Sequence, residues 1–431
     1  MQFNFNKSFG SSNSGYSDDT FTEVTNTSYG QNIGNSFKGI FVGIMLLIGS
    51  IWLLWWNEGR SVEQANALIE MQENITTLPN TSYSAVHEGK AVLVQGVVKP
   101  LNEVVDSEFG VKSSGLVLRK RVEMYQWEEE KESKSQDKLG GGTETVTTYT
   151  YVKKWSSMQN SSSFFKRQQG HQNPQMMHKS NTFTTDAQLG DFHLSRSVVS
   201  HIGASEPYSG LSTMPDTIGL AKNYKSFLYI GRDPSYPQIG DYKITYTYAP
   251  VGEYTIAAKE SSKSLMPYTT TNGKDLLFVR SGKVSAKSIF KDELEANALM
   301  TWILRGVGLL MMFIAFKMVM GPLETFAKVV PMFGSLVGGA SSIVAMVLTL
   351  LLGSIVISLA WFSSRPMLSL IIIVIGVGVA FMFGKFGKKK ETMTHKNTPA
   401  PSSPPKRDES METNSSTPPS RTESTPPSRE G

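Results

Sequence analysis

Four of the six histidines lie within one short stretch of the chain, at His171, His178, His193 and His201. Histidine is a frequent metal ligand, so this group suggests a metal site. However, the spacing does not match the helical H-E-x-x-H pattern, and the chain has no cysteine to complete a thiolate site. We therefore expect ordinary polar surface or hydrogen-bonding roles for these side chains, and we predict no metal and no cofactor.

The sequence lacks the motifs of the common hydrolytic and phosphoryl-transfer reactions. It contains no G-x-S-x-G nucleophile elbow and no phosphate-binding glycine loop. An intramembrane protease would need a nucleophile with a base, or paired aspartates, but the apolar segments of the chain contain neither histidine nor aspartate. We therefore predict no catalytic residue and expect that the protein is not an enzyme.

Two basic side chains, Arg305 and Lys317, fall inside one apolar segment. Ionisable groups at membrane depth are functional candidates by default. Arg305 lies near the predicted exoplasmic end of the segment and Lys317 near its cytosolic end, so each side chain can extend to the membrane surface. We expect both to anchor the helix rather than to line an ion path.

Small residues four positions apart recur in three apolar segments. This spacing lets helix backbones approach closely, either within one bundle or between subunits. The candidates for helix packing or an interface are Gly39 and Gly43, Gly334 and Gly338, and Gly376 and Ala380. We favour packing within the bundle, and we also expect a homo-oligomer.

These residues belong to four segments that are each long enough to cross a bilayer. A spanning helix needs about 20 mostly apolar residues, and the segments predict transmembrane helices at 36–56, 299–320, 334–362 and 366–384. A cleaved signal peptide is the competing interpretation of the first segment. That segment starts after a long polar arm, however, and Trp52, Trp55 and Trp56 at its end favour a membrane interface.

The short flanks of the helices indicate their orientation, because basic residues are enriched on the cytosolic side. One set of helix ends carries Lys38, Lys317, Lys328 and the cluster that begins at Lys385. The opposite ends carry Arg60 and Arg365. We therefore expect both termini in the cytosol and residues 57–298 on the exoplasmic side, either of a bacterial inner membrane or of a eukaryotic endoplasmic reticulum or inner nuclear membrane.

The long loop of residues 57–298 has the pattern of a β-rich domain. Apolar and polar side chains alternate in 116–126 and in 242–248, which is the period of half-buried strands. Further strands are expected at 91–98, 146–155, 225–230, 254–258 and 276–279. We predict a hairpin that joins 116–127 to 146–155 through a charged, glycine-rich linker at 128–142. The first helix should continue over 61–71, and Ser285 should cap the helix that leads into the second span.

Both ends of the chain have the composition of disordered segments. Residues 1–35 are rich in Ser, Asn, Gly and Thr, and residues 385–431 are first basic and then rich in Pro, Ser and Thr. A repeated S-T-P-P-S-R motif in this tail is compatible with a proline-directed partner, although we favour a solvated tail. The predicted fold is an α+β membrane protein with four transmembrane helices and a large β-rich exoplasmic domain between spans 1 and 2.

Several motifs in this order resemble the LUMA family of four-span membrane proteins, over roughly residues 37–386. They are Asn57-Glu58-Gly59-Arg60 after the first span, the strand 118–127 with Glu123, Tyr125 and Trp127, the segment 170–174 with Asn173 and Pro174, the segment 234–241, and Trp361 with Arg365-Pro366. The strand that ends in Trp127 is the most specific of these motifs.

The resemblance implies a large lumenal or periplasmic domain and brings no enzymatic activity. In animals it also implies residence in the endoplasmic reticulum and inner nuclear membrane, where family members organise membrane protein complexes and nuclear envelope structure. We therefore expect a non-catalytic membrane scaffold, with membrane lipids and other membrane proteins as partners and no nucleic acid. The alternative is a channel-like or lipid-handling membrane protein, suggested by the glycine-containing spans and by the aromatic residues of the loop.

Overall fold

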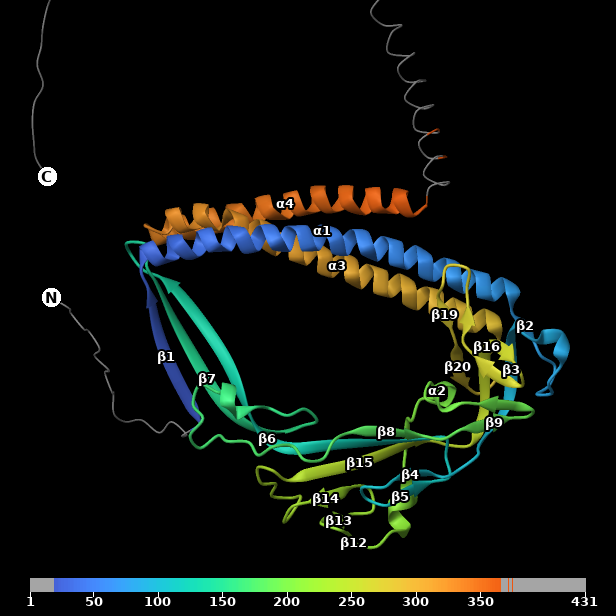
Figure 1. Cartoon of the computed structure of the whole chain (residues 1–431). Helices are drawn as coiled ribbons and strands as arrows, with labels where there is room; N and C mark the ends of the chain where they lie inside the picture. The colour runs from blue at the N-terminus through green and yellow to red at the C-terminus, as the bar shows by residue number, and fades with distance from the viewer. Residues whose placement is uncertain (1–18, 366–370, 372–373, 375–431) are drawn as a thin grey trace, which may run out of the picture. The chain divides into compact units, whose positions relative to one another are not determined.

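The computed structural model describes residues 19–365, 371 and 374, and residues 19–365 belong to one compact unit (Figure 1). The predicted fourth span at 366–384 and the predicted tail at 385–431 lie outside the described residues, apart from the isolated positions 371 and 374. The expectations for Gly376 and Ala380 lie outside them as well.

Three long helices carry the apolar segments, and each is long and apolar enough to cross a membrane. They are α1 (Tyr29–Asn74), α3 (Ala286–Ala327) and α4 (Pro331–Ser364). Ser28 begins α1 with a capping box, in which its side chain and that of Gln31 each accept a hydrogen bond from the other residue's backbone N–H. Ser285 caps α3 as predicted, because its side chain accepts a hydrogen bond from Ser288 N. Neither α1 nor α3 breaks where its apolar segment ends.

The larger of two main sheets contains nine strands and is built around β6 (Val117–Asp137). Its path is β1 (Thr20–Thr27), β7 (Thr143–Ser156), β6, β15 (Tyr242–Ala249), β14 (Leu228–Ile230), β13 (Ala221–Asn223) and β12 (Thr217–Ile218), with β8 (Asn181–Thr184) on β6 and β11 (Glu206–Pro207) on β15. The described pairings of this sheet are all antiparallel. The alternation predicted for 116–126 and 242–248 is confirmed, since Val122 lies directly opposite Ile244 and both are buried.

The second sheet has seven strands and packs against the helices. Its order is β2 (Thr76–Thr77), β3 (Ala91–Pro100), β9 (Ala187–Leu189), β10 (Phe192–Leu194), β17 (Ser264–Met266), β16 (Gly252–Ser261) and β20 (Phe278–Ser281), with β3 also paired to β16. Two small hairpins, a short helix and three 3-10 turns complete the domain: β4 (Val104–Asp106) with β5 (Val111–Ser113), β18 (Tyr268–Thr269) with β19 (Asp275–Leu276), α2 (Arg196–Val199), and Ala85–His87, Ser162–Phe164 and Ser209–Thr213.

A buried cluster joins the two long helices to this second sheet. Leu68 of α1 and Phe290 of α3 pack in one core with Leu93 of β3 and Phe278 of β20. Phe278 and Phe290 meet edge to face, with ring centroids 5.8 Å apart. The predicted extension of the first helix is thus present, and the β-rich domain is packed directly on helices that carry apolar spans.

The predicted hairpin exists, but it is much longer than expected. Residues 128–137 belong to β6 rather than to a linker, and the turn occupies only 138–142. The sequence pattern did not predict a strand over 128–137, because this charged run has no alternation of apolar and polar residues. Backbone pairing with β7 holds this part of β6 in place, from Met124 opposite Ser156 to Asp137 opposite Thr143.

The expectation of a disordered arm over residues 1–35 is wrong from residue 20 onward. β1 pairs with β7 over eight consecutive positions, from Thr20 opposite Thr150 to Thr27 opposite Thr143, and α1 starts at Tyr29. β1 contains four threonines, a valine and a phenylalanine, which are good strand formers within a polar composition. We call β1, β7 and residues 124–137 of β6 the ribbon.

Candidate functional sites

A buried ion pair joins α1 to α3 at the end of the apolar segments. Glu58 accepts two hydrogen bonds from Arg305, with 2.6 Å from Nε to Oε1 and 2.8 Å from Nη2 to Oε2. The Glu58 side chain is 2% exposed and that of Arg305 is 19% exposed. Such a bidentate pair satisfies both charges where water is scarce. Sequence analysis did not predict this partner of Arg305, which is a carboxylate of the neighbouring helix.

The other polar residues of this motif extend the contact along the two helices. Asn57 Nδ2 donates to the carbonyl oxygen of Thr301 at 3.0 Å, and Arg60 donates to Asn297 Oδ1 at 3.1 Å and to Thr301 Oγ1 at 3.2 Å. We call Asn57, Glu58, Arg60, Asn297, Thr301 and Arg305 the boundary clamp. These polar contacts extend over about two turns of α3. They fix how the two helices are rotated against each other, since any rotation would leave buried charges unpaired.

Within the apolar segments, Gly43 of α1 lies close to the backbone of α3. A Cβ atom added to Gly43 would lie 2.9 Å from the carbonyl oxygen of Ala315, whereas one added to Gly39 would lie 3.8 Å from that of Met318. Added Cβ atoms on Gly334 and Gly338 would instead face Lys328 and Glu324. These four glycines are therefore placed against neighbours within the chain, and Gly59 of the clamp motif has open space beside it.

A second polar contact lies at the opposite ends of the apolar segments. Lys317 forms an ion pair with Glu324 and also donates to Ser341 Oγ of α4 at 2.7 Å. Ser36 of α1 hydrogen-bonds to Thr325 of α3. Lys317 therefore binds neighbouring side chains, which sequence analysis did not predict.

In the β-rich domain, three predicted motif residues meet at the base of the ribbon. Asn173 Oδ1 accepts from Trp127 N at 2.7 Å, and Asn173 Nδ2 donates back to the Trp127 carbonyl oxygen at 2.9 Å. This reciprocal pair imitates a strand partner for Trp127. Pro174 follows directly, and its carbonyl oxygen accepts from Gln159.

The remaining motif residues lie on the same strand as Trp127. Tyr125 packs on Trp155 with ring centroids 5.2 Å apart, and Glu123 forms a surface ion pair with Arg121. The motifs thus contribute contacts that hold strands and loops together. They show no nucleophile in contact with a base.

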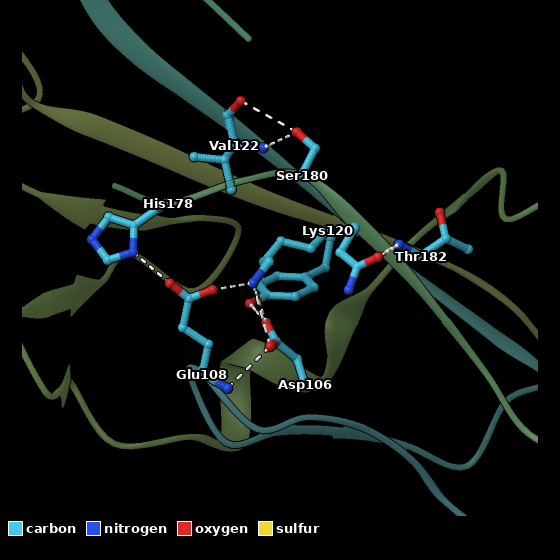
Figure 2. A network of polar contacts seen from close by, with 9 residues as sticks. Asp106, Glu108, Lys120, Val122, His178, Ser180 and Thr182 are labelled. Atoms are coloured by element: carbon cyan, nitrogen blue, oxygen red, sulfur yellow. Dashed lines mark hydrogen bonds and ion pairs between the residues drawn. The ribbon is translucent and has the colours of Figure 1, made fainter. Parts of the chain in front are cut away.

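Lys120 of β6 is buried between the carboxylates of Asp106 and Glu108 (Figure 2). The Lys120 side chain is 3% exposed, and its Nζ lies 3.2 Å from Asp106 Oδ2 and also pairs with Glu108. Glu108 in turn binds His178 Nδ1 at 2.5 Å, and Tyr246 donates its hydroxyl to Asp106 Oδ2 at 2.7 Å. Sequence analysis missed this network, because its members are far apart along the chain and none belongs to a catalytic pattern.

The charges of this network are compensated within the protein. Burial acts to raise the pKa of Glu108, but the hydrogen bonds from Lys120 and His178 outweigh it, so the pKa is lowered overall. Burial and the hydrogen bond to Asp106 raise the pKa of Tyr246 well above its ordinary value. Tyr246 therefore remains a hydrogen-bond donor, and the arrangement is a structural crosslink between β4, β6 and β15.

The four clustered histidines have different partners. His171 is buried and stacks on Tyr151 with ring centroids 3.9 Å apart, whereas His178 belongs to the Lys120 network. His193 lies on β10, and His201 contacts the Ser197 carbonyl oxygen. No group of three or more potential metal ligands occurs among the described residues.

The chain combines a β-rich domain with three helices that are long and apolar enough to cross a membrane. Two of them, α1 and α3, flank the domain in the sequence and pack on its second sheet. The chain is therefore an integral membrane protein of the α+β class. A sequence profile described as Transmembrane protein 43 matches residues 124–366. The chain belongs to the transmembrane protein 43 family, which confirms the resemblance seen in the motifs.

Three relatives illustrate the extent of the similarity. Transmembrane protein 43 of Rattus norvegicus is 30% identical over 352 residues, which cover 78% of this chain and 87% of the relative. Transmembrane protein 43 of Homo sapiens is 29% identical over 356 residues, which cover 79% of this chain and 88% of the relative. The homolog of Drosophila melanogaster is 29% identical over 63% of this chain and 73% of its own length. No solved structure matches the chain.

Proposed function

We propose that the protein is a non-catalytic integral membrane scaffold that organises membrane protein complexes, and through them the structure of an endomembrane, a nuclear envelope or a bacterial inner membrane. The observation that supports this function is the direct packing of the β-rich domain on the continuous helices α1 and α3, with Leu68 and Phe290 in its core. A domain fixed in this way presents its surface in one orientation to neighbouring membrane proteins.

The proposed orientation has the body of the β-rich domain on the exoplasmic side and both termini in the cytosol, while the tip of the ribbon, which contacts α1 at Asn32, lies at the cytosolic ends of the helices. The basic residues of the short flanks support this proposal, because Lys38, Lys317 and Lys328 lie at the helix ends opposite to those that join the body of the domain. The partners are proposed to be membrane lipids, further membrane proteins and additional copies of the chain. The domain contributes recognition surface rather than a reaction.

The experiment that tests the scaffold compares two variants of the full chain in native membranes. Arg305→Met breaks the boundary clamp, whereas Lys291→Ala removes a lysine of the same helix whose contact with Glu295 is exposed and 3.8 Å long. Crosslinking followed by purification should recover a defined complex for the native chain and for Lys291→Ala, and much less of it for Arg305→Met. The proposal fails if the native chain is monomeric and without partners after crosslinking.

A further inference from the structure

The tip of the ribbon contacts the helix ends that lie farthest from the core of the β-rich domain. Asn32 of α1 donates to the Gly141 carbonyl oxygen at 3.0 Å, and Gly140 N donates to the Val329 carbonyl oxygen at 3.1 Å. Lys328 forms an ion pair with Asp137 at 3.2 Å. Residues 37–56 of α1 lie between Asn32 and the boundary clamp. The ribbon therefore contacts α1 at the end opposite to the one packed on the domain.

The ribbon also has the length that a crossing requires. From Trp127 to Asp137, β6 rises about 33 Å at roughly 3.3 Å per residue. The hydrocarbon core of a bilayer is about 30 Å thick, and spanning β-strands contain about 9–11 residues. If α1 and α3 cross the membrane, the ribbon crosses it beside them.

Hydrocarbon cannot be the solvent of this ribbon, because both of its faces are polar. Residues that alternate along β6 place Glu128, Glu130, Glu132 and Lys134 on one face and Glu129, Lys131, Ser133 and Asp137 on the other. Charged side chains and unpaired backbone groups are expensive in lipid. The charged part of the ribbon, residues 128–137 of β6, must therefore lie in water, whereas Trp127, Tyr149 and Tyr151 nearer its base are buried against Phe165 and Ile239.

Both outer edges of the ribbon are without a partner strand in the part of the chain that the structure describes. β1 pairs with β7 alone, and residues 128–137 of β6 also pair with β7 alone. Open edges inside a membrane are avoided by closing the sheet into a barrel. Since one edge differs from the other, identical copies pair head to tail, and such pairing forms a closed ring when the rotation from copy to copy adds up to a full turn.

We propose that copies of this chain join their ribbons, with β1 of one copy beside β6 of the next, and that the closed ring lines a water-filled passage for small ions. The helices of the copies separate this passage from lipid with their exposed apolar side chains. The face that lines the passage carries Glu128, Glu130, Glu132 and Glu144 against Lys134 and Lys154. Because the acidic side chains predominate there, cations pass more readily than anions.

Cysteine crosslinking tests the ring, since the native chain contains no cysteine. Thr25→Cys on β1 is combined in turn with Lys131→Cys, Ser133→Cys or Ser135→Cys on β6, and the full chain is oxidised in membranes. Within one copy these positions are separated by β7, a distance of about 9.6 Å that exceeds the reach of a disulfide. At least one combination should give a ladder of linked copies, and no single variant should do so.

The control for this experiment is the pair Val24→Cys and Val146→Cys, which lie directly opposite each other on β1 and β7. This variant should form a disulfide within one copy. The proposal is overturned if the control disulfide forms and every combination stays monomeric, because the ribbon is then assembled but not joined. It is equally overturned if the control disulfide does not form, because the ribbon is then absent in the membrane.

Ion flux into liposomes tests the passage itself. Glu132→Arg changes an exposed glutamate of the lining face, and Glu295→Arg changes an equally exposed glutamate on α3, outside the ribbon. The native chain and Glu295→Arg should conduct potassium in preference to chloride, and Glu132→Arg should shift the preference toward chloride. Liposomes with verified insertion and no flux, or an unchanged preference in Glu132→Arg, would sink the proposal.

Discussion

Glu58 and Arg305 are 247 residues apart in the sequence and form a two-point ion pair between α1 and α3. Trp302 covers the pair from the next turn of α3, with its ring centroid 4.7 Å from the Arg305 guanidinium carbon. The N-E-G-R motif after the first span is thus one half of a helix–helix contact. Its other half is supplied by Asn297, Thr301 and Arg305.

Arg305→Met should destabilise the protein strongly, because it leaves the Glu58 carboxylate buried and unpaired. Loss of one partner of such a pair costs about 3 kcal/mol or more. The double variant with Glu58→Leu should recover part of the loss, since no charge then remains in the contact. Thermal unfolding of the chain in detergent measures both effects, and equal stabilities of the single and double variants would contradict the pairing.

Gly43→Ala should destabilise the packing of α1 on α3 by about 1–3 kcal/mol, because the added methyl group meets backbone and side chains of α3. Gly59→Ala is the matched change in the same helix. It adds the methyl group where no atom lies within 4 Å, and alanine favours a helix over glycine by up to about 1 kcal/mol. The same unfolding assay should rank Gly59→Ala above the native chain and Gly43→Ala below it. The reverse order would show that Gly43 does not face α3.

The apolar spans and the main strands could be predicted from the sequence because their signals are local. The segments at 36–56, 299–320 and 334–362 fall within α1, α3 and α4, and alternation located β6 and β15. The helix extensions were also visible, since Ser285 is a typical N-cap residue and apolar residues recur at helical spacing beyond Arg60.

The contacts that join these elements could not be predicted, because they depend on residues far apart in the chain. Taken alone, Arg305 indicates a charge that is costly to place in an apolar segment. Nothing near it in the sequence identifies Glu58 as its partner. Likewise β1 and residues 128–137 owe their strand conformation to pairing with β7 rather than to an apolar pattern. Tertiary pairing overrides local composition at both places.

Asn173→Ala should loosen the loop that packs on the ribbon base. The asparagine side chain makes three hydrogen bonds to backbone, namely from Trp127 N and to the carbonyl oxygens of Trp127 and Asn160. Their loss should cost about 3 kcal/mol, since buried backbone groups are left unpaired. Urea unfolding measures this cost, and limited proteolysis should show faster cleavage within 157–180. Asn74→Ala, which removes one exposed local contact, should leave both readouts unchanged.

The Lys120 network should lose stability in acid. Glu108 has a lowered pKa in the folded protein relative to its ordinary value of 4.5, because Lys120 and His178 hold its charged form against the effect of burial. The folded state therefore binds fewer protons than the unfolded state, so its stability is full above pH 4.5 and declines as the pH falls through the lowered pKa. Unfolding followed between pH 3 and pH 6 should show this decline, and Glu108→Gln should flatten it. An equal decline in Glu108→Gln would assign it to other carboxylates.

Glu260 of β16 has a raised pKa, in contrast to the lowered pKa of Glu108. Its side chain is fully buried, and neither carboxylate oxygen forms a hydrogen bond of ordinary geometry among the described residues. Burial raises its pKa and Glu88 acts in the same direction, whereas His87 and the nearby Ser84 backbone act to lower it. A buried and unpaired charge destabilises the folded state.

Glu260→Gln should therefore stabilise the protein at neutral pH, on the order of 1 kcal/mol, because the neutral amide removes the buried charge without changing the shape of the side chain. The sign is fixed by proton linkage. A carboxyl with a raised pKa binds more protons in the folded state, so its penalty is present above the raised pKa and disappears below it. Unfolding of the native chain and the variant should thus differ at pH 8 and converge in mild acid. A variant less stable than the native chain at pH 8 would show that the Glu260 carboxylate is bound in the folded protein.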